Sequence, residues 1–155
     1  MTRAFTFPGQ GSQAVGMGRE LAETFASARE VFGEVDEALG EKLSSIIWDG
    51  PEDRLILTEN AQPALMAVSM AVIRALEGEG VSVSGAASYV AGHSLGEYSA
   101  LAAAGALTLS DTARLLRTRG KAMQAAVPVG EGAMAALLGA DIEKATALAE
   151  AAAQG

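Results

Sequence analysis

The chain has 155 residues, of which 50% are hydrophobic and 19% charged, and its net charge at pH 7 is −8. This length suits one domain with a buried core, and the hydrophobic content excludes an intrinsically disordered chain. The acidic balance argues against a nucleic-acid-binding protein, which would present a basic patch. The sequence has no cysteine and a single histidine, His93, which excludes a disulfide framework, a thiol nucleophile and a histidine-rich metal site.

The sequence also lacks the usual features of a secreted or membrane protein. Residues 1–7 have neither the charged start nor the apolar run of a signal peptide. The longest mostly apolar stretch, residues 61–76, is interrupted by polar residues and a proline and is too short to span a bilayer comfortably. We therefore expect a soluble, cytoplasmic protein with no membrane partner.

The N-terminal third is expected to form a strand, a glycine-rich loop and two helices. Residues 3–7 alternate large and small side chains, which predicts a short strand. The loop that follows, residues 8–18, is typical of a backbone that approaches another group closely. The remaining predictions here are helices at 19–25 and 28–39, a cap at Ser27 and a turn at 48–51.

The rest of the chain alternates helices with short apolar strands. A long helix is predicted to begin with Pro63 in its first turn and to end at Gly78, with one hydrophobic face formed by Leu65, Val68, Val72 and Leu76. The other predicted elements are strands at 88–92 and 132–138 and helices at 95–104, 109–127 and 141–153. This order indicates α/β layering.

The segment Gly92-His-Ser94-Leu-Gly96 matches the G-x-S-x-G nucleophile elbow. A serine at a sharp strand-to-helix turn projects from the top of the sheet, and the helix N-terminus behind it favours a developing oxyanion. The alternative is a capping box, in which Ser94 caps its helix and Glu97 bonds back to the backbone. The five residues alone do not separate these interpretations, whereas the strand before and the helix after favour a nucleophile.

A serine nucleophile needs a base and an oxyanion hole. His93 adjoins Ser94, and neighbouring residues at a sharp turn point apart, so we interpret His93 as a structural or supporting residue. The base would then come from outside these 155 residues. The backbone N–H of Leu95 is expected to be the first oxyanion donor. The loop at residues 9–11 is suited to the second, although glycines there are also typical of a tight turn.

Arg119 occupies an unusual position on the predicted helix 109–127. At about 100° per residue, one face carries Arg114, Arg117 and Lys121, and we interpret that face as solvated surface. Arg119 falls on the opposite stripe, together with Leu115, Leu116, Met123 and Ala126. An arginine there must extend to solvent, pair with a buried carboxylate or bind a ligand anion. Structural pairing is the first interpretation, and a bidentate fork is also what a carboxylate substrate would require.

Several segments carry a family resemblance together. They are residues 7–13 (FPGQGSQ), 61–65 (AQPAL), 92–100 (GHSLGEYSA), 117–123 (RTRGKAM) and 132–136 (GAMAA). In this order, over essentially the whole chain, they resemble the malonyl-CoA:acyl carrier protein transacylase family and the related acyltransferase domains of fatty acid and polyketide synthases.

The resemblance implies an α/β fold with an α/β-hydrolase-like three-layer core around a short parallel sheet. Residues 1–128 would belong to this large subdomain, and residues 129–155 would begin a ferredoxin-like small subdomain. Members of the family are considerably longer, so the chain resembles an N-terminal half, and the family's catalytic histidine would lie beyond residue 155. We therefore expect the chain alone to be inactive or nearly so.

The resemblance also implies a ping-pong transfer of a malonyl group from malonyl-CoA to the phosphopantetheine thiol of acyl carrier protein. The implied site residues are the nucleophile Ser94, the oxyanion donors Gln10 and Leu95, the carboxylate-binding Arg119, and Gln62 and His93 as further substrate-binding residues. No metal is implied, and no cofactor, because the partner carries the phosphopantetheine. The implied partners are acyl carrier protein, malonyl-CoA and a complementing C-terminal half.

Two other functions stay open. A serine hydrolase or esterase of the α/β-hydrolase type shares the elbow but has no need of Arg119. A non-enzymatic module that binds CoA or acyl carrier protein, or an inert remnant, would use Ser94 only as a helix cap, whose loss costs about 1 kcal/mol.

Overall fold

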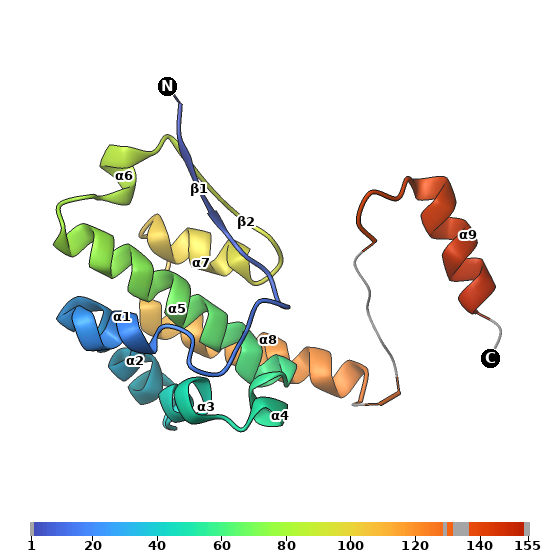
Figure 1. Cartoon of the computed structure of the whole chain (residues 1–155), viewed down its shortest axis with the longest axis horizontal. Helices are drawn as coiled ribbons and strands as arrows, with labels where there is room; N and C mark the ends of the chain where they lie inside the picture. Colours follow the sequence, from blue (N-terminus) through green and yellow to red (C-terminus); the bar gives the residue numbers. More distant parts are fainter. Residues whose placement is uncertain (1, 129, 132–136, 154–155) are drawn as a thin grey trace.

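The computed structural model describes residues 2–128, 130–131 and 137–153, and its main body is mostly helical (Figure 1). A parallel sheet lies at one side of this body, with α7 next to it and α5 crossing the centre. Within the described residues, no helix combines the length and apolar character needed to cross a membrane. The α/β class is confirmed, with helix content well above strand content.

The described part of the sheet has two strands, β1 (Ala4–Phe7) and β2 (Tyr89–Gly92), both close to their predicted positions. They are parallel, and Ala4 pairs with Tyr89 while Phe7 pairs with Gly92. The two strands are therefore brought together from distant parts of the sequence. Their C-terminal ends meet at one edge, where the glycine-rich loop and the elbow both begin.

The helices after β1 are α1 (Arg19–Thr24), α2 (Ala26–Leu39), α3 (Leu43–Asp49) and α4 (Glu52–Leu55). The predicted cap at Ser27 is wrong, because α2 begins two residues earlier than predicted and Phe25 is its N-cap. The turn predicted at 48–51 begins too early, because Trp48 and Asp49 still belong to α3. Helices α3 and α4 were not predicted from the sequence.

The central helix, α5 (Thr58–Gly78), is longer than predicted. It begins at Thr58, so Pro63 lies in its second turn and not in its first. The predicted hydrophobic face is also only partly correct, because Val72 is 43% exposed whereas Ile73 is buried. This helix is surrounded by α2, α7 and α8, so side chains on several of its faces are buried.

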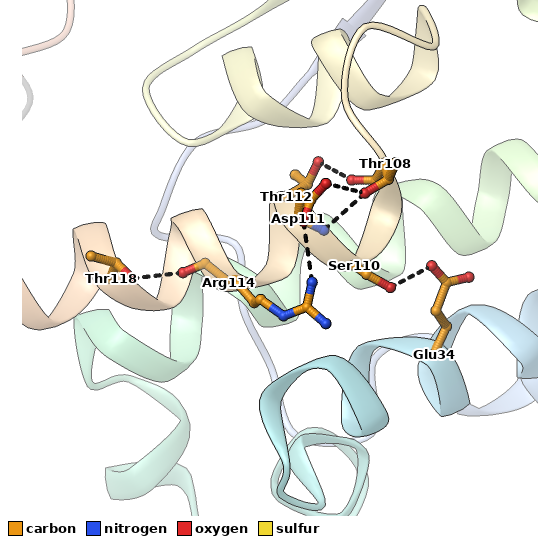
Figure 2. A network of polar contacts seen from close by, with 7 residues as sticks. All are labelled: Glu34, Thr108, Ser110, Asp111, Thr112, Arg114 and Thr118. Atoms are coloured by element: carbon orange, nitrogen blue, oxygen red, sulfur yellow. Dashed lines mark hydrogen bonds and ion pairs between the residues drawn. The ribbon is translucent and has the colours of Figure 1, made fainter.

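The remaining helices are α6 (Val83–Ala86), which was not predicted, α7 (Gly96–Ala103), α8 (Leu109–Ala126) and α9 (Ile142–Ala152). Thr108 caps α8 by accepting a hydrogen bond from the Asp111 N–H, and Ser110 ties α8 to Glu34 of α2 (Figure 2). Helix α9 stands apart from the other helices in Figure 1, and none of its described residues is buried. Residues 132–136 of the predicted strand 132–138 lie outside the described residues, and Leu137 and Leu138 belong to no strand.

Candidate active site

The elbow at Ser94 has the backbone that a nucleophile turn requires. Strand β2 ends at Gly92 and α7 begins at Gly96, so only three residues make the reversal. Ser94 has φ 55°, and among the described residues it is the only non-glycine residue with positive φ. An L-residue pays a conformational cost there, and such strain concentrates at functional sites.

The glycines on both sides of Ser94 allow the chain to pass very close to itself. A Cβ on Gly92 would overlap the backbone of Gly96 and Glu97. A Cβ on Gly96 would lie 2.7 Å from the Pro8 carbonyl oxygen and would overlap that of Phe7. The spacing of the motif therefore follows from steric contact between β1, β2 and the first turn of α7.

The structure does not support the capping interpretation of Ser94. Leu95 is the N-cap of α7, and Glu97 bonds Ser94 through the backbone, its N–H donating to the Ser94 carbonyl. Within the described residues, the Ser94 hydroxyl instead contacts Arg119, whose Nη2 donates to Ser94 Oγ across 3.1 Å. The side chain of Ser94 is exposed and is thus accessible to a substrate.

The glycine-rich loop after β1 packs against the elbow, as the positions of the proposed oxyanion donors require. The His93 N–H donates to the Phe7 carbonyl, and the His93 ring lies so close to Gly9 that a Cβ there would overlap it. Gln10 follows in this loop, and its side chain approaches Thr58 of α5 at 3.4 Å. In the described structure, neither Gln10 nor Leu95 uses its backbone N–H in a hydrogen bond, so both are available to a ligand.

His93 lies at the turn, as predicted, but in the described structure no hydrogen bond joins its ring to the Ser94 hydroxyl. Its ring packs on the Gly9 backbone, which agrees with a structural role. Because His93 is the only histidine of the sequence, these 155 residues provide no imidazole base for Ser94. No cluster of three potential metal ligands occurs among the described residues.

Arg119 comes from α8 and reaches the elbow from the side of α5. Its Nη1 donates to Gln62 Oε1 at 2.7 Å, and its Nη2 is the group that contacts Ser94. The guanidinium carbon also lies 5.9 Å from the centre of the Tyr98 ring, a cation–π distance. The prediction that Arg119 leaves the solvated face is confirmed, and its structural partner is an amide and not a carboxylate.

Gln62 is completely buried, although its side chain is polar. Arg119 has only donors, so the amide oxygen of Gln62 must face it, and the Gln62 Nε2 is left to contact Met123 Sδ at 3.3 Å. A thioether is a weak acceptor, so Arg119 is the stronger of the two partners. Gln62 thus fixes one side of the guanidinium that contacts Ser94.

The face of α8 assigned to solvent is wrong for Arg117. Its side chain is only 11% exposed, and its Nη1 donates to the Glu59 carbonyl at 2.7 Å and to Asn60 Oδ1, while its Nη2 pairs with Glu41. Burial lowers the pKa of the Arg117 guanidinium below its usual value. Leu115 is also misplaced in the prediction, because it is 45% exposed. The sequence feature that bears on the burial of Arg117 is Pro63, which lies on α5 and not on α8.

The sheet, the strained serine at its strand-to-helix turn and the arginine beside it define the class of proteins with a serine nucleophile elbow and an anion-binding group. The chain belongs to the acyl transferase domain family, whose model matches residues 4–152. The resemblance stated from the motifs is therefore confirmed.

Three relatives show how strong the similarity is. The malonyl CoA-acyl carrier protein transacylase of Bacillus subtilis (strain 168) is 54% identical over 140 residues, which are 90% of this chain and 43% of that protein. The acyl-carrier-protein-S-malonyltransferase structure from Bartonella henselae matches with a TM-score of 0.91 and 64% identity, over 99% of this chain and 49% of that one. A malonyl-transacylase solved in complex with its type II PKS acyl-carrier protein matches with a TM-score of 0.88 and 43% identity, over 100% and 49% of the two chains. The chain thus spans about half the length of the relatives that it matches.

Proposed function

We propose that this chain is the nucleophile-bearing half of a malonyl-CoA:acyl carrier protein transacylase. The observation that carries the proposal is the contact between the strained Ser94 and Arg119. A nucleophile alone would fit many acyl transfers, whereas a guanidinium next to it selects an acyl group that ends in an anion. Malonyl, with a free carboxylate one methylene from its thioester carbonyl, is such a group.

In the proposed first half-reaction, Ser94 Oγ attacks the thioester carbonyl of malonyl-CoA. The C–S bond breaks, the CoA thiol leaves with the proton of the serine, and a malonyl ester forms on Ser94. The free N–H groups of Gln10 and Leu95 would bind the oxyanion of the tetrahedral intermediate. Arg119 would bind the carboxylate, while Gln62 orients Arg119 and His93 supports the turn.

In the second half-reaction, the phosphopantetheine thiol of acyl carrier protein attacks the ester and regenerates Ser94. The complex of a relative with its acyl-carrier protein supports this choice of partner. The chemistry needs no metal and no cofactor bound to this chain. Acyl carrier protein is acidic and so is this chain, so a local basic surface would have to receive it.

The proton of Ser94 needs a base that these residues do not supply, as the single histidine packs on Gly9. We propose that a histidine in a C-terminal half provides it, in keeping with the share of the relatives that this chain covers. That half would also complete a three-layer core over residues 1–128 and a ferredoxin-like subdomain that begins at residue 129. The cytoplasmic location stays a prediction.

The test is to incubate the chain with malonyl-CoA and locate the modification by peptide mass spectrometry. The same test is made on the chain fused to the C-terminal part of the B. subtilis relative, with Ser94→Ala as control. We expect a malonyl ester on Ser94 that forms much faster in the fusion. Rapid steady transfer by the chain alone would contradict the proposed need for a second half.

A further inference from the structure

Pro63 leaves a gap in the hydrogen bonding of α5. In an α-helix the N–H of residue 63 would donate to the carbonyl of Glu59, but proline has no N–H. The Glu59 carbonyl is partly buried, and leaving it without a donor would be costly, so its partner must come from elsewhere. In this structure the partner is Arg117 of α8, whose Nη1 lies 2.7 Å from the Glu59 oxygen.

The guanidinium of Arg117 is held from more than one side. Beyond the Glu59 carbonyl, it donates to Asn60 Oδ1 and pairs with Glu41. Asn60 is itself fixed, because its Nδ2 donates to the Arg54 carbonyl at the end of α4 at 2.7 Å. A planar fork with several fixed donors can meet these acceptors together, which a lysine ammonium cannot do in the same geometry.

Helix α8 packs very closely against α5 at this same place. A Cβ on Gly120 would lie 2.6 Å from the Glu59 Cα and 2.7 Å from the Thr58 carbonyl oxygen. The two helices therefore meet backbone to backbone beside Arg117. A lateral shift of α8 would break the Arg117 contacts.

Arg119 leaves α8 two residues later, on the other side of the helix, and bonds Gln62, the residue before Pro63. The two arginines thus hydrogen-bond to neighbouring parts of one short segment of α5, Arg117 at Glu59–Asn60 and Arg119 at Gln62. We propose that Arg117 is a positioning residue for Arg119, because it replaces the donor that Pro63 lacks and so fixes α8 against α5. This inference rests on the proposed function in assigning Arg119 to the carboxylate of the acyl group.

The positions of the two partners of Arg119 explain why the placement of α8 against α5 matters. Its Nη1 lies 2.7 Å from Gln62 of α5 and its Nη2 lies 3.1 Å from Ser94, which lies in the turn between β2 and α7. A shift of α8 by about 1 Å would break one of these bonds, and misplacement on this scale can cost about 100-fold in rate.

The first test measures the side chain of Arg119 directly in this chain, whether or not it turns over substrate. The arginine Nε–Hε signals are recorded by ¹⁵N NMR in the wild type and in Arg117→Met, Arg117→Lys and Arg114→Met. Arg114 is the matched control, because it lies on the same helix, is exposed and pairs with Asp111 (Figure 2). We expect Arg117→Met to move the Arg119 signal to the position of a free, disordered arginine, Arg117→Lys to restore it in part, and Arg114→Met to leave it unchanged.

The second test compares the initial rates at which malonyl-CoA and acetyl-CoA acylate Ser94 in the fusion with the C-terminal part of the B. subtilis relative. A misplaced Arg119 should lower the malonyl-to-acetyl preference about 10- to 100-fold, whereas general loss of structure would lower both rates alike. If the folded wild-type fusion is not malonylated at all, the proposed function fails, and the NMR test still decides the positioning role. An Arg119 signal and an acyl preference that both stay unchanged in a folded Arg117→Met protein would overturn the proposal.

A double-mutant cycle tests the part played by Pro63. Pro63→Ala restores an N–H that can donate to the Glu59 carbonyl within the helix. We expect the effect of Arg117→Met on the Arg119 signal to be smaller in the Pro63→Ala background than in the wild type. Equal effects in the two backgrounds would show that Arg117 does not substitute for the missing donor, and circular dichroism checks that each variant is folded.

Discussion

Arg119 and Ser94 are joined by a hydrogen bond of 3.1 Å between Nη2 and the serine Oγ, although 25 residues separate them in the sequence. The bond places a fixed positive charge beside the hydroxyl that we propose to be acylated. An acyl group on Ser94 would therefore meet the guanidinium within a few bonds of the ester carbonyl. The contact would account for the proposed preference for a short acyl group with a terminal carboxylate.

Replacing Ser94 with Ala should abolish acylation without unfolding the chain. The hydroxyl does not cap α7, so we expect the free energy of unfolding in urea to change by less than the cost of about 1 kcal/mol for losing a cap. Thr108→Ala is the matched control, because Thr108 does cap α8 and should cost about that amount. A larger loss for Ser94→Ala than for Thr108→Ala would restore the capping interpretation.

Replacing Arg119 with Ala separates malonyl transfer from simple ester hydrolysis. Loss of a charged hydrogen-bonding partner should lower malonylation of Ser94 about 10- to 100-fold, while acetylation and the hydrolysis of a neutral ester are largely retained. The comparison uses initial rates with malonyl-CoA, acetyl-CoA and an aryl acetate. Equal losses with all three substrates would count against the carboxylate-binding role.

The buried amide of Gln62 should matter for both stability and selectivity. Gln62→Leu removes the acceptor of Arg119 Nη1 at a completely buried position, and we expect a loss of about 1–3 kcal/mol in the free energy of unfolding together with a weaker malonyl preference. Met123→Leu is the control, since it removes only the weak sulfur acceptor. If the two variants have the same malonyl preference, Gln62 does not orient Arg119.

Gly96, two residues after the proposed nucleophile, should not tolerate any side chain. Gly96→Ala places a Cβ against the carbonyl of Pro8 and overlaps that of Phe7, so we expect a loss of more than about 3 kcal/mol. Gly33→Ala is the control within helix α2, where nothing lies within 4 Å of the added Cβ and a gain of about 0.5–1 kcal/mol is expected. Thermal melting of both variants checks this prediction, and a stable Gly96→Ala protein would contradict the steric account of the motif.

Elements set by local residues could be predicted from the sequence. Strand β1, strand β2 and helix α7 lie within one residue of their expected positions, because the turn at Ser94 has a local pattern. Helical spacing alone predicts that Arg119 does not lie on the solvated face of its helix. Its partner Gln62 was found only through the family resemblance, because no local pattern links α5 to α8.

Features that depend on distant contacts were missed. The start of α3 is stabilised by Asp36, which accepts hydrogen bonds from the N–H and the hydroxyl of Ser44, eight residues away. The sequence next to α3 therefore contains no capping residue from which the helix could be predicted. A helical projection places Arg117 on the surface, whereas its burial depends on acceptors from other segments, among them the Glu59 carbonyl that lacks a donor because of Pro63. The helix α3 and the burial of Arg117 were missed for the same reason. In each case the hydrogen-bonding partner lies outside the local segment.

The most direct test of the account is the identity of the acylated residue. The fusion with the C-terminal part of the B. subtilis relative is mixed with equal amounts of malonyl-CoA and acetyl-CoA, and its peptides are analysed by mass spectrometry. We predict one malonyl group per chain on Ser94, in clear excess over acetyl, and none in Ser94→Ala. A folded fusion that carries malonyl on another residue, or that transfers malonyl with Ser94 replaced, would contradict the account.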